Sequence, residues 1–159
     1  MGDMLVKLWE LPPLAPVLDA TAAQGVVVRR ALAPEKPVVL DWMRMHFPAW
    51  TAEVDAAFAR LPVACFVAVR DGELLGFACH DAIAPDFFGP TAVLASARGQ
   101  GLGRALALAA MHALEAQGYA YAIVGGVGPV AYYEKAFGAI AIPGSTPGIY
   151  DGMLRKLSG

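Results

Sequence analysis

The sequence predicts a single α/β domain in which helices flank one mixed sheet. Three observations lead to this prediction. Short β-branched runs alternate with helical patterns, an Asp-Gly turn joins two apolar runs in mid-chain, and a glycine-rich loop connects a strand-like run to a long helix. The chain has 159 residues and shows no repeat or low-complexity linker, so we expect one domain over residues 1–159. The order of these elements favours a mixed sheet.

The first half of the chain is predicted to contain two strands and two helices. Residues 5–9 and 26–30 have strand patterns, and a proline-rich connection joins them. A helix begins at Ala33-Pro34-Glu35, because apolar residues then follow at helical spacing as far as His46. Pro48 ends this helix, and another is expected over residues 51–60.

The second half begins with a hairpin of residues 63–69 and 73–80 around the Asp71-Gly72 turn. A strand over residues 87–94 leads into the glycine loop. The Ala- and Leu-rich helix over residues 102–117 then ends at Gly118, a typical residue after a helix terminus. A buried strand is expected over 119–125, a short helix from Pro129 to 137, and closing strands over 139–142 and 149–154.

The two cysteines of the chain flank the predicted hairpin. A two-residue turn places Arg70 opposite Glu73 and Cys65 opposite Ala78. Cys65 and Cys79 would then point to opposite faces of the sheet. We expect both to be reduced, buried thiols with no reactive role.

Composition excludes several classes of function. Apolar residues make up 57% of the chain and charged residues 16%, against about 25% charged in ordinary soluble chains. This favours a well-filled core and a further apolar surface that a homodimer would bury. A net charge of −2 gives no basic field, so we expect no nucleic-acid partner. The three histidines are scattered, and we expect no metal site.

The sequence also bears on where the protein resides. The N-terminal region carries early acids and several prolines, which is unlike a signal peptide. The longest uncharged runs, such as residues 119–133, contain glycine, proline and tyrosine and are too short to span a membrane. We therefore expect a cytoplasmic protein that does not bind membranes.

Residues 97–104 form the most informative segment, Ala-Arg-Gly-Gln-Gly-Leu-Gly-Arg. Glycine lacks a Cβ, so this backbone can turn sharply and bring its N–H groups close to a ligand. The helix that follows begins with unpaired N–H groups and a partial positive charge. Together these features form a site for a phosphate or pyrophosphate. The loop predicts a phosphate-bearing cofactor.

Other phosphate-binding loops fit this segment poorly. A Walker A loop needs Gly-Lys-Ser or Gly-Lys-Thr, and neither tripeptide occurs in the sequence. A dinucleotide fingerprint starting at Gly99 needs glycine or alanine at Arg104, and one starting at Gly101 needs it at Leu106.

A second fingerprint match occurs at Gly126, Gly128 and Ala131, with Asp151 about twenty residues later. Only 28 residues follow Ala131, which is too few for the further βαβ units of a dinucleotide fold. This argues against a dinucleotide fold, and we keep NAD binding at this segment only as the rival hypothesis.

Two motifs resemble those of the GCN5-related N-acetyltransferase (GNAT) superfamily. The family spacing Arg/Gln-x-x-Gly-x-Gly/Ala is matched by Arg98, Gly101 and Gly103. Residues 132–138, Tyr-Tyr-Glu-Lys-Ala-Phe-Gly, are similar to the family segment Phe/Leu-Tyr-x-Lys-x-Gly-Phe. The resemblance covers residues 87–142. It implies a mostly antiparallel sheet flanked by helices, acetyl-CoA as the donor without a metal, and an amine as the acceptor.

The resemblance also implies where the donor binds. In the family, the strand before the loop splays from the strand after the next helix, and pantetheine inserts between them. The backbone of Thr91 and Val93 would contact pantetheine, and Gly125 and Gly126 would leave room for the acyl arm. Many relatives carry Asn at the Gly126 position. The implied cofactor-binding residues are Thr91, Val93, Arg98, Gly99, Gln100, Gly101, Leu102, Gly103, Arg104, Gly125 and Gly126.

Tyr133 matches the family tyrosine that meets the thioester sulfur. A phenol with a pKa near ~10 is protonated at neutral pH and can give its proton to the leaving thiolate. Tyr132 faces about 100° away on a helix, so we assign catalysis to Tyr133 and packing to Tyr132.

The sequence identifies neither the general base nor the acceptor. Neither predicted strand of the cofactor site carries a carboxylate. His80, Asp81, Asp86 and Glu53 are nearby candidates that also fit turns or helix surfaces, and a water relay is the default. Small amines, amino sugars and amino acids are all suitable acceptors, and a non-catalytic acyl-CoA-binding module is the alternative function. The family acceptor region carries the aromatic residues Trp42, His46, Phe47, Trp50, Phe87, Phe88 and Tyr150.

Overall fold

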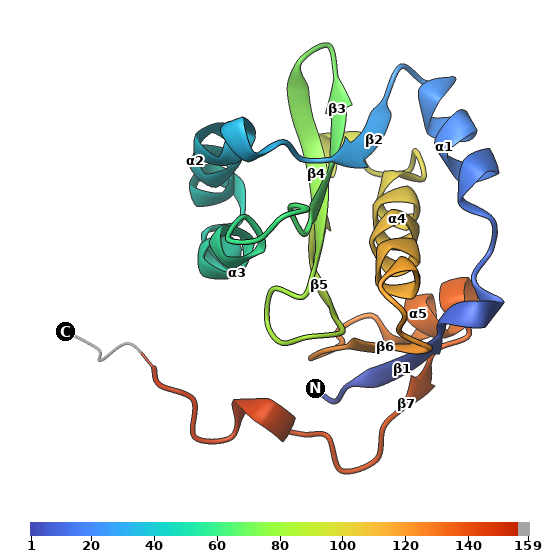
Figure 1. Ribbon diagram of the computed structural model, residues 1–159, viewed down its shortest axis with the longest axis vertical. Coiled ribbons are helices and arrows are strands. Elements are labelled where there is room, and N and C mark those ends of the chain that lie inside the picture. Colours follow the sequence, from blue (N-terminus) through green and yellow to red (C-terminus); the bar gives the residue numbers. More distant parts are fainter. Residues whose placement is uncertain (156–159) are drawn as a thin grey trace.

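The computed structural model describes residues 1–155 and contains one seven-stranded sheet in the order β2-β3-β4-β5-β6-β1-β7 (Figure 1). Neighbouring strands are antiparallel except for β5 and β6, which are parallel. The mixed, mostly antiparallel sheet expected from the sequence is therefore confirmed. The strands are β1 (Met4–Lys7), β2 (Val27–Arg30), β3 (Cys65–Arg70), β4 (Glu73–His80), β5 (Phe87–Val93), β6 (Tyr121–Val124) and β7 (Ile140–Ala141).

Helices cover both faces of the sheet. On one face α4 (Leu102–Ala116) packs with α1 (Leu14–Ala22), and on the other α2 (Lys36–His46) packs with α3 (Thr51–Ala57) (Figure 1). The fifth helix, α5 (Val130–Phe137), precedes β7. None of these helices is long and apolar enough to cross a bilayer, in the part of the chain that the structure describes.

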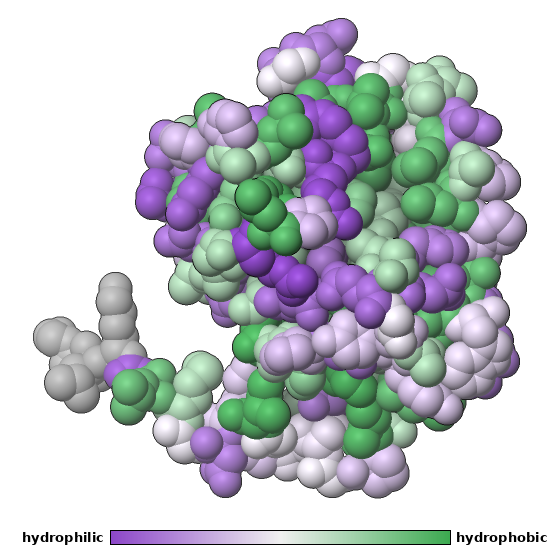
Figure 2. Space-filling view, in the orientation of Figure 1, coloured by the Kyte–Doolittle hydropathy of each residue, from purple (hydrophilic) through white to green (hydrophobic). Residues whose placement is uncertain are grey.

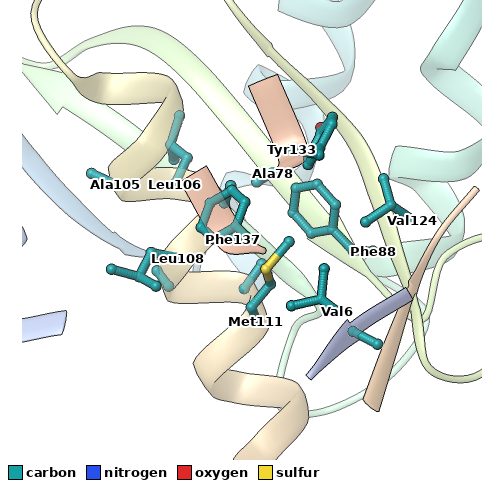
Figure 3. Close-up of a cluster of buried hydrophobic side chains, with 14 of the residues drawn as sticks. Val6, Ala78, Phe88, Ala105, Leu106, Leu108, Met111, Val124, Tyr133 and Phe137 are labelled. Atoms are coloured by element: carbon teal, nitrogen blue, oxygen red, sulfur yellow. The ribbon is translucent and has the colours of Figure 1, made fainter. Parts of the chain in front are cut away.

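The sheet divides the interior into two apolar cores. The larger core is built around α4, whose alanines and leucines are mostly buried, as their high helix propensity and apolar side chains predict. Phe88, Tyr133 and Phe137 gather in this core beside Met111 (Figure 3). The smaller core lies under α2 and α3 and contains Phe77 of β4. Strand β5 runs between the two cores and has residues in contact with both.

Helix α1 was not predicted, because the sequence analysis assigned these residues to a proline-rich connection. Pro16 lies in the first turn, where its missing N–H breaks no helical hydrogen bond. Val17 and Leu18 pack against the larger core, and the buried Thr21 hydroxyl donates to the Leu18 carbonyl at 2.9 Å. The predicted strand at residues 5–9 is also shorter, because a 3₁₀ helix, Leu8–Glu10, follows β1.

The predicted pairing of the cysteines is wrong. A β-bulge between Ala68 and Val69 shifts the register by one residue, so Cys65 pairs with Cys79 rather than with Ala78. Gly76, just beyond the bulge, permits close strand packing, because a Cβ there would lie 2.8 Å from the Ala92 carbonyl oxygen. Both thiols are free and buried on the same face of the sheet.

The predicted closing strand over residues 149–154 is also wrong. Gly148 and Gly152 adopt positive φ angles of 62° and 69°, which interrupt an extended backbone. A 3₁₀ helix, Gly148–Tyr150, takes its place. The segment after β7 turns back beneath the sheet toward the α3 side (Figure 1). It thereby forms a wall of the candidate site.

Candidate active site

Strands β5 and β6 diverge, and this split creates the site. They pair only at Phe87 with Ile123 and at Phe88 with Val124. Beyond these pairs Pro90 has no N–H to donate to a ladder, and β6 ends at Val124. The second half of β5 therefore has no strand partner on the β6 side.

A cavity of about 820 Å³ lies in this split. Gly103 and Ala107 of α4 line it on one face of the sheet, whereas Trp50 and Glu53 line it on the α3 face. The cavity therefore passes through the sheet, with lining residues on both of its faces. Figure 2 shows the surface hollowed between the C-terminal segment and the body that carries α3. The remaining lining residues are Met1, Ile83, Phe88, Gly89, Pro90, Thr91, Ala92, Val93, Val124, Gly125, Gly126, Val127, Gly128, Pro129, Tyr132, Tyr133, Thr146, Pro147 and Tyr150.

The glycine loop lies at the start of α4. Gly99 and Gly101 have φ angles of 82° and 78°, and a Cβ built on either would meet no heavy atom within 4 Å. These conformations favour glycine, and the space in front of them is open. No side chain caps the first turn of α4. Its N–H groups are therefore free to bind an anion such as a pyrophosphate.

The side chain of Gln100 positions the loop. Arg70, at the end of β3, donates a hydrogen bond from Nη2 to Gln100 Oε1 at 2.6 Å. Gln24, after α1, donates from Nε2 to the Gln100 carbonyl at 3.1 Å. The Gln100 side chain is thus held by the protein, which leaves its backbone as the group available to a ligand.

The other loop residues divide into buried and exposed groups. Leu102 is 1% exposed and packs in the larger core, so only its backbone can reach a ligand. Arg98 donates from Nε to the Val93 carbonyl at 3.4 Å. Arg104 is exposed, and its charge acts against the burial that raises the pKa of Tyr132.

The strand residues expected at the site all line the cavity. The Thr91 hydroxyl donates to the Phe77 carbonyl at 2.9 Å, so this side chain is committed to β4. A Cβ on Gly125 would lie 3.0 Å from the Phe87 ring and 3.3 Å from the Tyr150 hydroxyl. Glycine at 125 thus permits close packing of these two rings, whereas Gly126 faces open space.

Tyr133 and Tyr132 both line the cavity, but at different depths. Tyr133 is 6% exposed and packs between Phe88 and Phe137 (Figure 3). Tyr132 is 41% exposed. Burial, and then the neighbouring Tyr132, raise the pKa of Tyr133. The Tyr133 hydroxyl therefore keeps its proton at neutral pH and can act as a donor.

Of the four candidate bases, Glu53 lines the cavity and the others do not. His80 is 1% exposed and bonds through Nδ1 to Asp81 Oδ2 at 2.6 Å, and burial lowers its pKa. Asp81 also receives a hydrogen bond from the Asp86 backbone N–H and forms an ion pair with Arg60. His80 and Asp81 form a structural network at the end of β4, which Asp86 joins through its backbone N–H.

The aromatic residues expected in the acceptor region fall into two groups, one at the cavity and one in the smaller core. Trp50, Phe88 and Tyr150 line the cavity. Trp42 and Phe47 instead pack on Phe77 in the smaller core. The sequence could not make this division, because aromatic side chains with helical spacing fit a core and a binding site equally well.

Within residues 1–155, no group of three or more His, Cys, Asp or Glu side chains is placed to hold a metal ion. The polar side chains that line the cavity are one carboxylate, three tyrosines and two threonines: Glu53, Tyr132, Tyr133, Tyr150, Thr91 and Thr146. Of the glycine loop and the first turn of α4, Gly103 lines the cavity, whereas Arg98, Gly99, Gln100, Gly101, Leu102 and Arg104 do not.

Solved structures with the same fold include several acetyltransferases. One is a GCN5-related glucosamine N-acetyltransferase region of a fungal multi-domain β-N-acetylglucosaminidase, with a TM-score of 0.72 and 13% identity over 89% of this chain and 19% of that chain. Another, from Sphaerobacter thermophilus, has a TM-score of 0.64 and 16% identity over 89% and 48%. A third, from Kribbella flavida, has a TM-score of 0.52 and 20% identity over 90% and 58%.

These similarities establish the fold, and this chain spans about half or less of the first two solved chains. The search of curated proteins found no match. The sequence model of the Acetyltransferase (GNAT) family matches residues 29–139, which is more than half of the chain and runs from within β2 past the end of α5. This match contains both the glycine loop and the tyrosine segment of the cavity. The chain therefore belongs to the GNAT family of acetyltransferases.

Proposed function

We propose that this chain is an acetyl-CoA-dependent N-acetyltransferase that moves the acetyl group directly from the CoA thioester to the amine of a small molecule. The observation that carries the proposal is the cavity that passes through the sheet between β5 and β6. A cavity lined from both faces of the sheet can hold a donor and an acceptor side by side, so that they react without a covalent enzyme intermediate. Its volume of about 820 Å³ is in the range of small-molecule sites.

The residues present fit the donor. The left-handed loop at Gly99 and Gly101 leaves the first-turn N–H groups of α4 open to a pyrophosphate. The backbone of Thr91 and Val93 lies on the unpaired side of the split, where an extended pantetheine arm can add like a strand. When bound, acetyl-CoA supplies an activated acetyl thioester.

Tyr133 then supplies the proton for the leaving group. As the acceptor nitrogen forms its bond to the carbonyl carbon, the C–S bond breaks and its electron pair goes to sulfur. The Tyr133 hydroxyl donates a proton to that sulfur and regains one from solvent. The proton lost by the acceptor nitrogen leaves through water or through Glu53, the carboxylate that lines the cavity.

Turnover tests the proposal. Acetyl-CoA is incubated with a panel of alkylamines, amino sugars and amino acids, and CoA release is measured together with the acetylated product. We expect amine-dependent release of CoA with one amide formed per thiol. Tight CoA binding with no turnover of any acceptor would instead identify a non-catalytic acyl-CoA-binding module.

A further inference from the structure

Glu53 is the one charged side chain among the described residues that line the cavity. No lysine, arginine, histidine or aspartate side chain lines the cavity among the described residues. Glu53 belongs to α3, on the face of the sheet opposite the glycine loop. It therefore stands on the side from which an acceptor would enter.

One oxygen of Glu53 has no partner. Oε2 is buried and makes no hydrogen bond within residues 1–155. A buried charged oxygen without a partner is costly, and natural proteins rarely retain one without a ligand or a water to satisfy it. The position of Glu53 in the first turn of α3 favours a negative charge there, but it gives Oε2 no hydrogen bond.

The other acid near this end of the cavity is already satisfied. Asp3 Oδ1 accepts a hydrogen bond from the Gly126 N–H at 2.9 Å, which fixes the end of β6. Burial, then the charges of Asp3 and Glu53, raise the pKa of the Tyr150 hydroxyl. Both carboxylates therefore lie near Tyr150, and Glu53 is the one with a buried oxygen that makes no hydrogen bond within the described residues.

Aromatic side chains line the same cavity as the Glu53 carboxylate. Trp50 and Tyr150 line the cavity with Glu53. Trp50 is held by Phe47, whose ring is stacked on it at 5.9 Å, and by Phe77 at 6.4 Å. An anionic oxygen beside fixed aromatic faces is an arrangement that binds an organic cation.

We infer that Glu53 is the specificity-determining residue of the acceptor end, where its Oε2 binds the ammonium group of a cationic amine whose apolar body lies against Trp50 and Tyr150. The inference rests on the proposed function, because it names the acceptor class of the same cavity. It excludes anionic acceptors, which the Glu53 charge repels.

The first experiment measures binding without turnover. Calorimetry with the CoA-saturated protein compares 2-phenylethylamine, which is an ammonium at pH 7.5, with 2-phenylethanol, which has the same body and no charge. We expect the wild type to prefer the ammonium by about 10- to 100-fold, as for other charge-assisted hydrogen bonds. Glu53→Gln should abolish the preference. Asp55→Asn makes the same charge change at an exposed position of α3 and should keep it.

Stability separates a binding role from a structural one. Gln at position 53 removes an unsatisfied charge, so we expect Glu53→Gln to melt at the wild-type temperature or above it. A structural Glu53 would instead give a lower melting temperature. The inference is overturned if the wild type shows no preference for the ammonium, or if Glu53→Gln retains it.

Turnover distinguishes this inference from the proposed function. If amines are acetylated and Glu53→Gln leaves the KM of cationic acceptors unchanged, the inference fails and the proposed function stands. If the Glu53-dependent preference is present but no amine is acetylated, the proposed function fails and the cation site stands. When the inference and the proposed function both hold, Glu53→Gln raises the KM of cationic amines about 10-fold or more. The KM of acetyl-CoA then stays within about 2-fold of the wild-type value.

Discussion

At the scale of single residues, two tyrosines adjacent in sequence have different environments. Tyr133 lies under Phe88 and beside Phe137, whereas Tyr132 is 41% exposed at the cavity rim. Sequence reasoning favoured Tyr133 from its motif position, and the structure places both rings in the cavity lining. The assignment of the proton donor therefore stays a prediction that kinetics can test.

Replacing Tyr133 by Phe should lower kcat by about 10²-fold, because the ring still packs but the proton donor is lost. The KM of acetyl-CoA should change little, since the hydroxyl acts on the leaving sulfur rather than on the ground state. Steady-state thiol release measures both constants. Tyr132→Phe is the matched control and should retain activity. Equal losses in the two variants would remove the assignment to Tyr133.

Asp86 should make stability depend on pH. Burial, then the charge of Asp81, raise the Asp86 pKa to about 6 from its ordinary value of 3.8. A carboxyl whose pKa rises on folding stabilises the fold at low pH and loses that contribution as pH increases through about 6. Asp86→Asn should therefore increase the free energy of unfolding by about 1 kcal/mol at pH 8, a value reduced for partial exposure, and by much less at pH 4.

Urea unfolding at pH 4 and pH 8 measures this effect. Asn tolerates the φ angle of 67° at position 86, so the substitution adds no strain. Asp71→Asn changes another aspartate with a positive φ, in the exposed hairpin turn, and should give no such difference. An equal gain at both pH values would contradict the electrostatic explanation.

At the scale of elements, α4 links the core to the candidate cofactor site. Its apolar side chains anchor it in the larger core, while its uncapped first turn faces the split. The helix begins at Leu102, immediately after the left-handed Gly101, and Gly118 with a φ of 100° follows its other end. Substitutions at Gly101 and Gly118 therefore form a matched pair, because both glycines have positive φ angles and lie at opposite ends of the same helix.

Gly101→Gln should raise the KM of acetyl-CoA at least about 10-fold or abolish binding, because the side chain would occupy the space before the first-turn N–H groups. No heavy atom lies within 4 Å of its Cβ, so the substitution strains the backbone at its φ of 78° but meets no steric clash. Gly118→Gln introduces similar backbone strain at the far end and should lower stability without changing that KM. An unchanged KM for Gly101→Gln would exclude the loop as the pyrophosphate site.

At the scale of the whole molecule, the split between β5 and β6 leaves the sheet with few backbone pairs at its centre. Two residue pairs join the β2–β5 part to the β6-β1-β7 part, and α4 and the C-terminal segment provide further contacts. A ligand that inserts between the two strands would bridge both parts of the sheet. Binding should therefore stabilise the entire fold.

CoA at about 100 times its dissociation constant should stabilise the protein by about 2.7 kcal/mol, which is about 5–10 °C in Tm for a chain of this size. Thermal unfolding with increasing CoA measures the shift. NAD at the same concentrations is the comparison, since the rival fingerprint at Gly126–Ala131 predicts that NAD stabilises instead. A shift with NAD and none with CoA would favour that rival.

The sequence by itself determined the fold class, the family resemblance and the position of the glycine loop. These depend on local features, namely apolar periodicity, the Asp71-Gly72 turn and the spacing of Gly101 and Gly103, which neighbouring residues encode directly. Helix α1 was missed because its stability comes from packing on the larger core rather than from its own proline-rich sequence.

Only the tertiary structure decided which side chains meet. A one-residue bulge placed Cys65 opposite Cys79, and no local pattern announces such a shift. Glu53 fitted an exposed helix surface in the sequence, yet the packing of α3 against the split directs it into the cavity with one oxygen unpaired. Contacts between distant segments depend on how elements pack, so the donor loop could be predicted from sequence and the acceptor end could not.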